Sequence, residues 1–328
     1  MAVPRKTSQQ TASEAPEASR PWLSLARREA LWAYIFLAVP LAFFLYLRIW
    51  PAFQSFWLSL FTWHVSPAER DFVGARYYLE MLQTPKFRQA LVNTLQYTLV
   101  IVPVQLVLGL VIASLLNNVR AFKGLFRAIY FAPFITPAVA IAWVWGWMYS
   151  VNFGILNTML IELDILAESW GLGWLNFEPQ PFLTSPDQAL YAVAAVVIWQ
   201  QLGFQVVIFL AGLQSIPRIF YDAAKIDGAS GWQLFRHITL PLLNPVMVFS
   251  VVISTIASLQ LFDQVVNINF TDQGGPLSST LTIALYMYQE AFGRSRLGYA
   301  AAVTVVLFVL ILIVTLVQLR FFSRRIDY

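Results

Sequence analysis

Long runs of apolar residues alternate with short polar segments along the chain. A helix that crosses the hydrocarbon core of a bilayer needs about 20 apolar residues, and six runs are long enough. They lie within residues 30–61, 89–119, 128–161, 188–217, 238–262 and 297–319. This pattern predicts an all-α, polytopic membrane protein with six transmembrane helices. Pro103, Pro133 and Pro137 fall inside the expected spans, where neighbouring helices can absorb kinks.

The polar segments on the outer side also contain helical patterns. Residues 76–97 read as an amphipathic helix that runs into the second span, and residues 281–292 as a short surface helix. Residues 271–276, which lie between the fifth span and residues 281–292, have the composition of a turn. The outer segment 150–187 carries acidic residues and neither lysine nor arginine.

Composition supports a membrane protein and limits the possible chemistry. Of the 328 residues, 59% are hydrophobic and 12% are charged, about half of the roughly 25% charged residues of soluble domains. The chain has no cysteine, which excludes a disulfide framework and a thiolate metal site. His64 and His237 lie in different loops. We therefore expect no catalytic residue and no metal site, and nothing indicates a nucleic-acid partner.

Lysine and arginine are concentrated in alternate polar segments. Of 21 such residues, 14 lie in the N-terminal segment, after the second span, after the fourth span and after the sixth, whereas six lie in the other loops. Cytoplasmic loops carry the excess of these residues, so both termini are expected in the cytoplasm of a bacterial cell, with the spans in its inner membrane. The first outer loop, which has four, departs from this trend.

The spans define the expected domain organisation. Residues 1–29 are rich in Ser, Glu, Ala and Pro and are expected to form a disordered cytoplasmic tail that is not cleaved. Residues 30–322 would form the transmembrane domain, and residues 323–328 a cytoplasmic end.

The polar segment between the fourth and fifth spans, residues 217–241, has the pattern of two short helices. Pro217 suits the first turn of a helix. Gly228 ends that helix where a left-handed residue is expected. Ser230 can cap a second helix that runs to about Ile238. The segment therefore predicts a helix–turn–helix held between two spans at the cytoplasmic surface.

This segment resembles the EAA loop of ABC importer permeases. The match consists of residues at fixed spacing: Asp222-Ala223-Ala224, Gly228, Ile238 and Leu240-Pro241, with Asp222 in place of the usual glutamate. The surrounding residues, Ile226 to Ala229 and Ile238 to Leu243, are similar to the carbohydrate-type branch that includes the maltose permeases. Gly274-Gly275-Pro276 also resembles a segment of this family, so the resemblance covers most of the chain from the first span onward. It implies the type I importer permease fold with a cytoplasmic coupling loop.

The resemblance also implies a heteromeric complex. Its members would be this chain, a second permease, a dimer of ATP-binding-cassette ATPase subunits and an extracytoplasmic solute-binding protein. No lysine in the chain follows a glycine, so the chain lacks a Walker A loop. ATP and magnesium are therefore expected on the ATPase, with no cofactor in this chain. The expected coupling residues are Tyr221, Asp222, Ala223, Ala224, Asp227, Gly228, Ala229, Trp232, Phe235, Ile238, Leu240 and Pro241.

Each part of the loop has an expected role in coupling. Ala223 and Ala224 have small side chains, which would let the ATPase backbone approach that of the loop. Asp222 is expected to pair with a basic group of the ATPase, as the acidic position of the family motif implies. Trp232 and Phe235 would pack within the loop or against the ATPase. Closure of the ATPase dimer would then rock spans four and five and switch the cavity between inward-facing and outward-facing.

Polar residues in spans four and five are candidates for the solute path, by analogy with related permeases. The candidates are Gln200, Gln201, Phe204, Ser254, Ser258, Gln260 and Asp263. Amides and hydroxyls beside aromatic rings suit a sugar. Two alternatives remain: the serines form a small-residue stripe that also suits close helix packing, and Asp263 also suits a cap at the outer end of span five.

The charge of the spans bears on the solute. No lysine or arginine lies between the membrane ends of spans two to six, whereas a phosphorylated solute favours cations in its site. A neutral sugar-like solute is therefore preferred over glycerol phosphate, which the same architecture could import. A secondary transporter would need coupling carboxylates within the membrane, for which only Asp263 is a candidate. A membrane enzyme would need a clustered acid, base or metal site, and none is visible.

Overall fold

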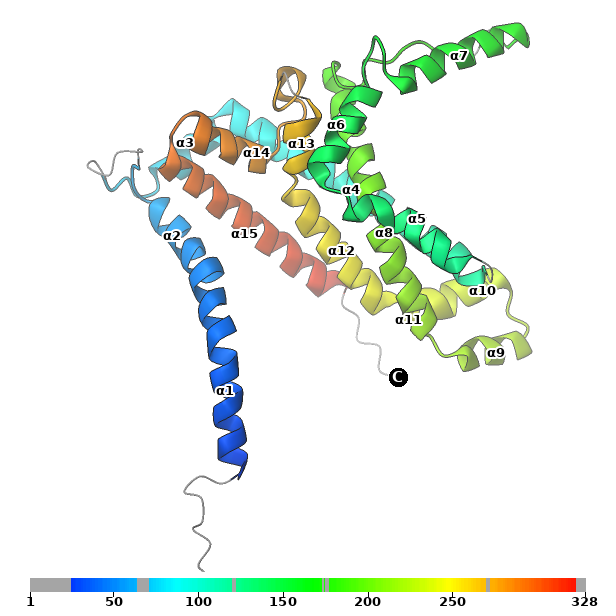
Figure 1. Cartoon of the computed structure of the whole chain (residues 1–328), viewed down its shortest axis with the longest axis horizontal. Helices are drawn as coiled ribbons and strands as arrows, with labels where there is room; N and C mark the ends of the chain where they lie inside the picture. Colours follow the sequence, from blue (N-terminus) through cyan, green and yellow to red (C-terminus); the bar gives the residue numbers. More distant parts are fainter. Residues whose placement is uncertain are drawn as a thin grey trace, which may run out of the picture. The chain divides into compact units, whose positions relative to one another are not determined.

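A computed structural model describes residues 25–63, 71–119, 122–172, 174, 177–269 and 272–322. These residues are mainly helical, as Figure 1 shows, which confirms the all-α prediction; an isolated bridge pairs Phe61 with Phe72. The chain divides into two compact units, Met1–Gln54 and Ser55–Tyr328. Most of the expected tail and all of the expected C-terminal end, residues 323–328, lie outside the described residues. Residues 25–29 are helical, because helix α1 begins at Leu25 rather than at residue 30.

The first unit contains α1 (Leu25–Phe44), the π-helical segment η1 (Leu45–Ile49) and the beginning of α2 (Trp50–Leu58). Together, residues Arg27–Leu58 are long and apolar enough to cross a membrane. Apolar side chains such as Phe36 and Phe43 are exposed along this unit. An apolar helix surface of this kind is stable in lipid, where the helix satisfies its own backbone hydrogen bonds.

The second unit contains the remaining candidate spans. Three are single helices, α4 (Pro85–Asn118), α8 (Pro186–Ser215) and α15 (Leu297–Phe322). Two more are helix pairs. In the first pair, α5 (Lys123–Ile135) meets α6 (Ala138–Met148) at a bend of 93°. In the second, Gly231–Leu242 meets α12 (Asn244–Leu259) at a bend of 66°. If each pair counts as one span, the described chain contains the six that the sequence predicts.

Proline explains the first bend and is accommodated at the second. Thr136 is extended, with ψ of 136°, because the ring of Pro137 disfavours helical geometry in the preceding residue. In the second pair, Pro245 lies in the first turn of α12, where its missing N–H costs no helical hydrogen bond. The sequence analysis predicted a kink at Pro137 within one continuous helix. The structure shows instead that the helix is interrupted there.

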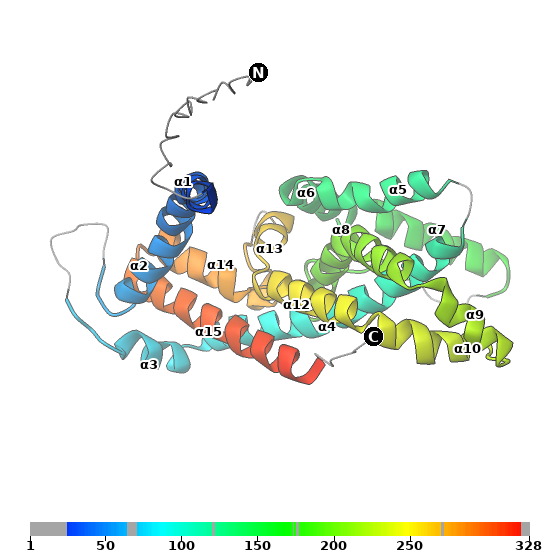
Figure 2. The ribbon, with the colours of Figure 1, turned by 90° about the horizontal axis from the view of Figure 1, so that it is seen from below.

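The spans of the second unit pack through small residues and buried apolar side chains. Helix α8 packs along α4 and α5, and α12 lies against α4 and α15 (Figure 2). At the crossing of α8 and α5, a Cβ atom added to Gly203 would lie 2.0 Å from the carbonyl oxygen of Tyr130. Only glycine therefore permits this approach of the two backbones.

The outer segments are built from short helices. Helix α3 (Arg76–Gln83) stops at Thr84, because Thr84 precedes Pro85 and is extended. The predicted continuous helix over residues 76–97 is thus two helices, α3 and α4. Helix α7 (Ile155–Ser169) follows α6, and α13 (Asp263–Ile268) follows α12.

Most of the segment predicted as a surface helix, residues 281–292, is buried instead, although Tyr288 and Phe292 are exposed. It forms α14 (Ile283–Tyr288) and the π-helical η4 (Gln289–Gly293), after the short 3₁₀ turn η3 (Pro276–Ser278). The backbone N–H of Ile283 donates to Thr94 Oγ1 at 2.9 Å, and Asn93 donates to the carbonyl of Leu281 at 3.0 Å. Because these two polar side chains of α4 bind its backbone, the segment can be buried.

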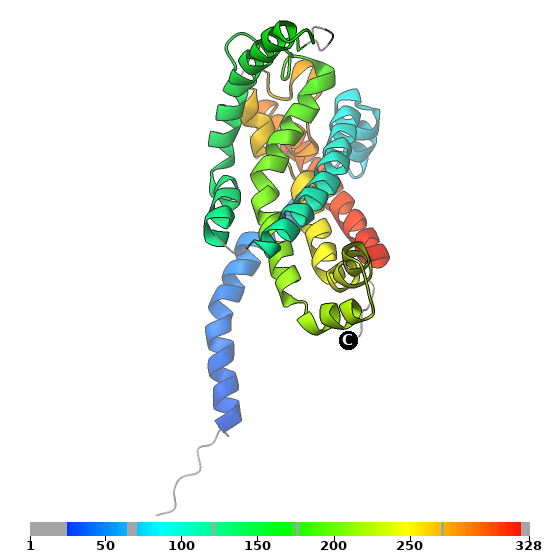
Figure 3. The same ribbon diagram turned by 90° about the vertical axis from the view of Figure 1, so that its right-hand side faces the viewer.

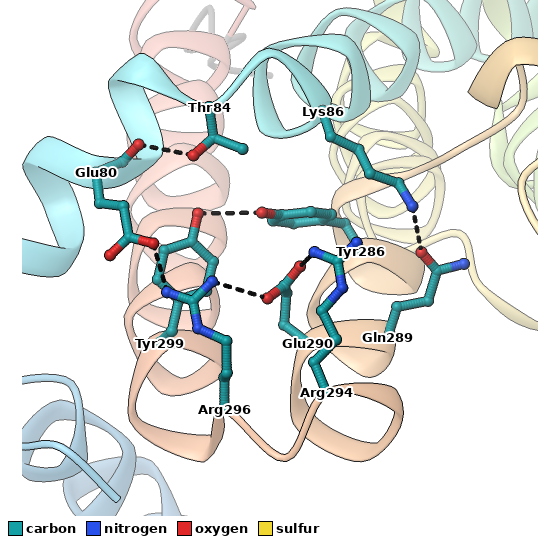
Figure 4. Close-up of polar contacts among 9 residues, drawn as sticks. All are labelled: Glu80, Thr84, Lys86, Tyr286, Gln289, Glu290, Arg294, Arg296 and Tyr299. Carbon is teal, nitrogen blue, oxygen red and sulfur yellow. Dashed lines mark hydrogen bonds and ion pairs between the residues drawn. The ribbon is translucent and has the colours of Figure 1, made fainter.

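An ion cluster fixes this outer corner (Figure 4). The carboxylate of Glu290, whose side chain is 0% exposed, accepts hydrogen bonds from Arg294 and from Arg296, the latter at 3.3 Å. Arg296 also pairs with Glu80 on α3. Burial acts to lower the pKa of Arg296, but the hydrogen bond to Glu80 and the nearby carboxylates raise it. The cluster therefore joins α3, η4 and the start of α15 as one charged unit.

Candidate functional site

The predicted coupling loop extends from the end of α8. Figures 1 and 3 show helices α7 and α9 (Arg218–Ile226) at opposite ends of α8. Pro217 is the N-cap of α9, one position before the first helical turn in which the sequence analysis put it. Ile216 is extended, with ψ of 120°, as expected before proline, and this ends α8.

The turn between the two arms has the predicted geometry. Gly228 has φ of 80°, in the left-handed region, and its N–H donates to the carbonyl of Lys225 at 3.1 Å. Ser230 and Gln233 form a reciprocal capping box at the start of α10 (Gly231–Leu234). The predicted glycine turn and serine cap are both confirmed.

The second arm is continuous with the following span. Helix α10 passes into the π-helical η2 (Phe235–Thr239) and then into α11 (Leu240–Leu242), which leads to α12. The arm therefore does not end at Ile238, since the helical backbone continues through Pro241.

Two contacts make the loop a compact unit. The hydroxyl oxygens of Tyr221 and Thr239 lie 3.0 Å apart and connect the two arms. The rings of Trp232 and Phe235 stack with centroids 5.7 Å apart. A force applied to either arm would therefore move the whole loop and, through its covalent ends, α8 and α12.

One face of α9 is apolar and exposed. Ile219, Ala223 and Ile226 follow i, i+4, i+7 spacing and form what we call the α9 stripe. Ile219 is 71% exposed and Ile226 is 87% exposed. The expected coupling residues did not include these two isoleucines, although their spacing is visible in the sequence.

The remaining expected coupling residues face elsewhere. Ala224, Asp227, Gly228 and Ala229 line a hollow of about 390 Å³ between the arms, together with Ile238. Tyr221 and Asp222 line a separate polar cavity on another face of α9. Leu240 is half-buried and Pro241 is exposed in α11. Their roles in coupling stay predictions.

The expected solute-path residues fall into two groups. Most lie in contacts between helices of this chain. The Gln200 side chain is 5% exposed, donates to the Thr136 carbonyl at 3.2 Å and accepts from Gln264 at 2.8 Å. Three more candidates form side-chain hydrogen bonds to a neighbouring helix: Gln201 with Gln105 at 3.5 Å, Ser254 with Gln205, and Ser258 with Thr98 at 3.2 Å. The ring of Phe204 stacks on that of Phe134.

The other group is exposed. Gln260 and Asp263 lie at the outer end of α12 and the start of α13. Trp145 and Trp199 make an edge contact, with ring centroids 5.5 Å apart, on the neighbouring helices α6 and α8. The solute path therefore stays a prediction.

Comparison with known proteins identifies the family. Residues 105–328 match the family of binding-protein-dependent transport system inner membrane components, which is more than half of the chain. The chain belongs to this family of permeases. It is accordingly a multi-pass membrane protein, a permease subunit of a binding-protein-dependent ABC importer, and a transport component rather than an enzyme.

Named relatives cover nearly the whole permease. The lactose transport system permease protein LacF of Rhizobium radiobacter is 34% identical, over 92% of this chain and 97% of the relative. The trehalose/maltose transport system permease protein MalF of Thermococcus litoralis is 33% identical, over 90% and 95%. The sn-glycerol-3-phosphate transport system permease protein UgpA of Yersinia pestis is 29% identical, over 94% and 99%.

Solved structures share the permease fold. A chain of a bacterial ABC transporter that imports the acidic polysaccharide alginate superposes with a TM-score of 0.74 at 22% identity, over 90% of this chain and 98% of that one. A second alginate transporter structure, in complex with an alginate-bound periplasmic protein, gives a TM-score of 0.71 at 22% identity, over 90% and 94%. At this identity the likeness concerns the fold alone.

Proposed function

We propose that this permease works with a second permease to import a sugar or sugar-like neutral solute. A separate ATP-binding-cassette ATPase dimer would bind ATP with magnesium and drive the cycle. An extracytoplasmic solute-binding protein would deliver the solute. The observation that carries this proposal is the α9 stripe, an exposed apolar surface on a compact loop that is continuous with two candidate spans.

The stripe supports docking to the ATPase. Burying an isoleucine side chain stabilises a contact by roughly 1.5–3 kcal/mol, so Ile219 and Ile226 favour a partner over water. Ala223 between them lets a partner backbone come close. The lysine and arginine distribution favours a cytoplasmic position for this loop and for both termini.

Coupling would be mechanical. The Tyr221–Thr239 contact holds the two arms together, and the Trp232–Phe235 stack stiffens the second arm. Closure of the ATPase dimer would therefore displace the whole loop, and α8 and α12 would tilt with it. Alternating access to the solute path follows from that tilt.

The spans favour a neutral, hydroxyl-rich solute. No lysine or arginine lies within residues 89–119, 128–161, 188–217, 238–262 or 297–319, the apolar parts of spans two to six. Exposed polar groups such as Gln260 and Asp263 suit hydroxyls. The names of relatives refer to lactose and to trehalose or maltose. Glycerol 3-phosphate is the second candidate, because UgpA is also a relative over most of its length.

The coupling proposal is tested by Ile226→Glu, which puts a charge on the stripe without disturbing the core. We expect at least a tenfold loss of ATPase co-purification with the permease complex. The control is Leu277→Glu, since Leu277 is 86% exposed and lies between α13 and α14. Equal ATPase recovery from both variants would contradict docking through the stripe.

The solute proposal is tested on the cognate solute-binding protein. Its thermal shift is measured against a panel of neutral mono- and oligosaccharides and against glycerol 3-phosphate. A neutral sugar should give the largest saturable shift. A shift with glycerol 3-phosphate alone would support the second candidate and reject the first.

A further inference from the structure

A polar cavity of about 610 Å³ lies beside the coupling loop, on a face of α9 that adjoins the α9 stripe. The ends of α4 and α8 form its other walls. Arg218, Asp222 and Lys225 reach it from α9, and Asn118 and Gln214 reach it from α4 and α8. The cavity thus combines two cations, one carboxylate and three amides, the third being that of Asn117.

The cations are not neutralised by direct ion pairs. Arg218, Asp222 and Lys225 are exposed and lie on one side of α9 within two turns. In the described part of the chain, the ion pairs all belong to the outer cluster around Glu290, and none includes a residue of α9. The cavity therefore has a net positive charge and open hydrogen-bonding capacity.

The position of the cavity relates it to the membrane surface. Two long apolar helices end at it, α4 at Asn118 and α8 at Ser215. The apolar side chains of Leu213 and Ile216 form its inner wall and are buried. Basic pockets at the cytoplasmic ends of transmembrane helices match anionic lipid head groups, and cations on a flexible stem match phosphate groups generally.

We propose that this cavity binds a phosphate ester that carries hydroxyl groups. Arg218 and Lys225 contact the phosphate oxygens, and Asp222, Asn118 and Gln214 bind the hydroxyls. The ligand is either the glycerol phosphate head group of a phospholipid in the inner leaflet or a soluble sugar or glycerol phosphate. Because it joins α9 to the end of α4, bound ligand holds the coupling loop in one position.

The test measures binding to the purified full-length permease, so it depends neither on transport nor on the ATPase. The probes are glycerol 3-phosphate, inorganic phosphate and short-chain phosphatidylglycerol, with phosphatidylcholine and potassium chloride at equal ionic strength as controls. Melting temperature should rise saturably with glycerol 3-phosphate, with phosphatidylglycerol or with both. A response to the lipid alone identifies the head group, and a response to the soluble ester alone identifies the cytosolic ligand.

Variants separate this cavity from other anion sites. The double variant Arg218→Gln/Lys225→Gln should weaken binding at least tenfold. The control Arg236→Gln removes an exposed cation of the same loop outside the cavity and should leave binding unchanged. Asp222→Asn should reduce the preference for glycerol 3-phosphate over inorganic phosphate. No saturable response to any probe, or equal responses from the double variant and the control, would overturn the proposal.

Discussion

Gly228 controls the geometry of the coupling loop. Its φ of 80° is open to glycine and unavailable to proline, whose ring fixes φ near −65°. Gly228→Pro should therefore rebuild the turn and uncouple ATP hydrolysis from uptake, while membrane insertion continues. Gly231→Ala is the matched control, because an added Cβ meets no atom within 4 Å. If Gly228→Pro retained normal uptake and ATPase assembly, the loop assignment would be wrong.

Glu290 should be more important for stability than an ordinary surface carboxylate. Its side chain is fully buried between Arg294 and Arg296 (Figure 4). Glu290→Gln removes the charge that both arginines face and should cost about 1–3 kcal/mol, which lowers the melting temperature. Glu162→Gln, in the exposed helix α7, should change it little. A Glu290→Gln protein as stable as wild type would show that the cluster is not a clamp.

A substitution at Gln201 tests whether this residue belongs to the solute path. It is partly exposed, and its amide oxygen accepts from Gln105 at a long 3.5 Å. Gln201→Leu should weaken uptake while ATPase attachment survives. Uptake kinetics and ATPase co-purification are measured on the same preparation. Unchanged kinetics would remove Gln201 from the solute path.

The elements differ in how far the sequence alone defines them. The two arms of the coupling loop follow from local chemistry, since Gly228 and Ser230 need no distant partner. The ion cluster does not, because Glu80 and Arg296 are 216 residues apart in the chain. Pro137 marks the break in the sequence, but the 93° angle between α5 and α6 depends on how these helices pack. The polar cavity likewise needs α4, α8 and α9 together.

Close packing of α5 on α8 gives a test at the scale of elements. The carbonyl of Tyr130 occupies the space that a side chain at Gly203 would need, with 2.0 Å to an added Cβ. Gly203→Ala should therefore force the two helices apart and cost about 1–3 kcal/mol. The control is Gly124→Ala in α5. A Cβ added there meets no atom within 4 Å, so this variant should be neutral or slightly stabilising. Equal melting temperatures for the two variants would contradict the packing.

At the scale of the whole molecule, this permease is a set of membrane helices with a compact loop joined to two of them. Its ion cluster joins α3, η4 and the start of α15, and the coupling loop lies at the end of α8 opposite α7 (Figure 3). We propose that the α9 stripe is the point where energy from ATP enters the membrane helices. That claim requires contact between Ile226 and an ATPase subunit.

The most direct measurement is cross-linking from Ile226→Cys, which is specific because the chain has no native cysteine. The assembled transporter in inverted membrane vesicles is treated with a benzophenone maleimide, which couples to the thiol at one end and on illumination to any neighbouring chain at the other, with Leu277→Cys as the control. We predict a covalent adduct with the ATPase from Ile226→Cys and none from Leu277→Cys. The absence of that adduct, or labelling of Ile226→Cys in intact cells by a membrane-impermeant maleimide, would contradict the account.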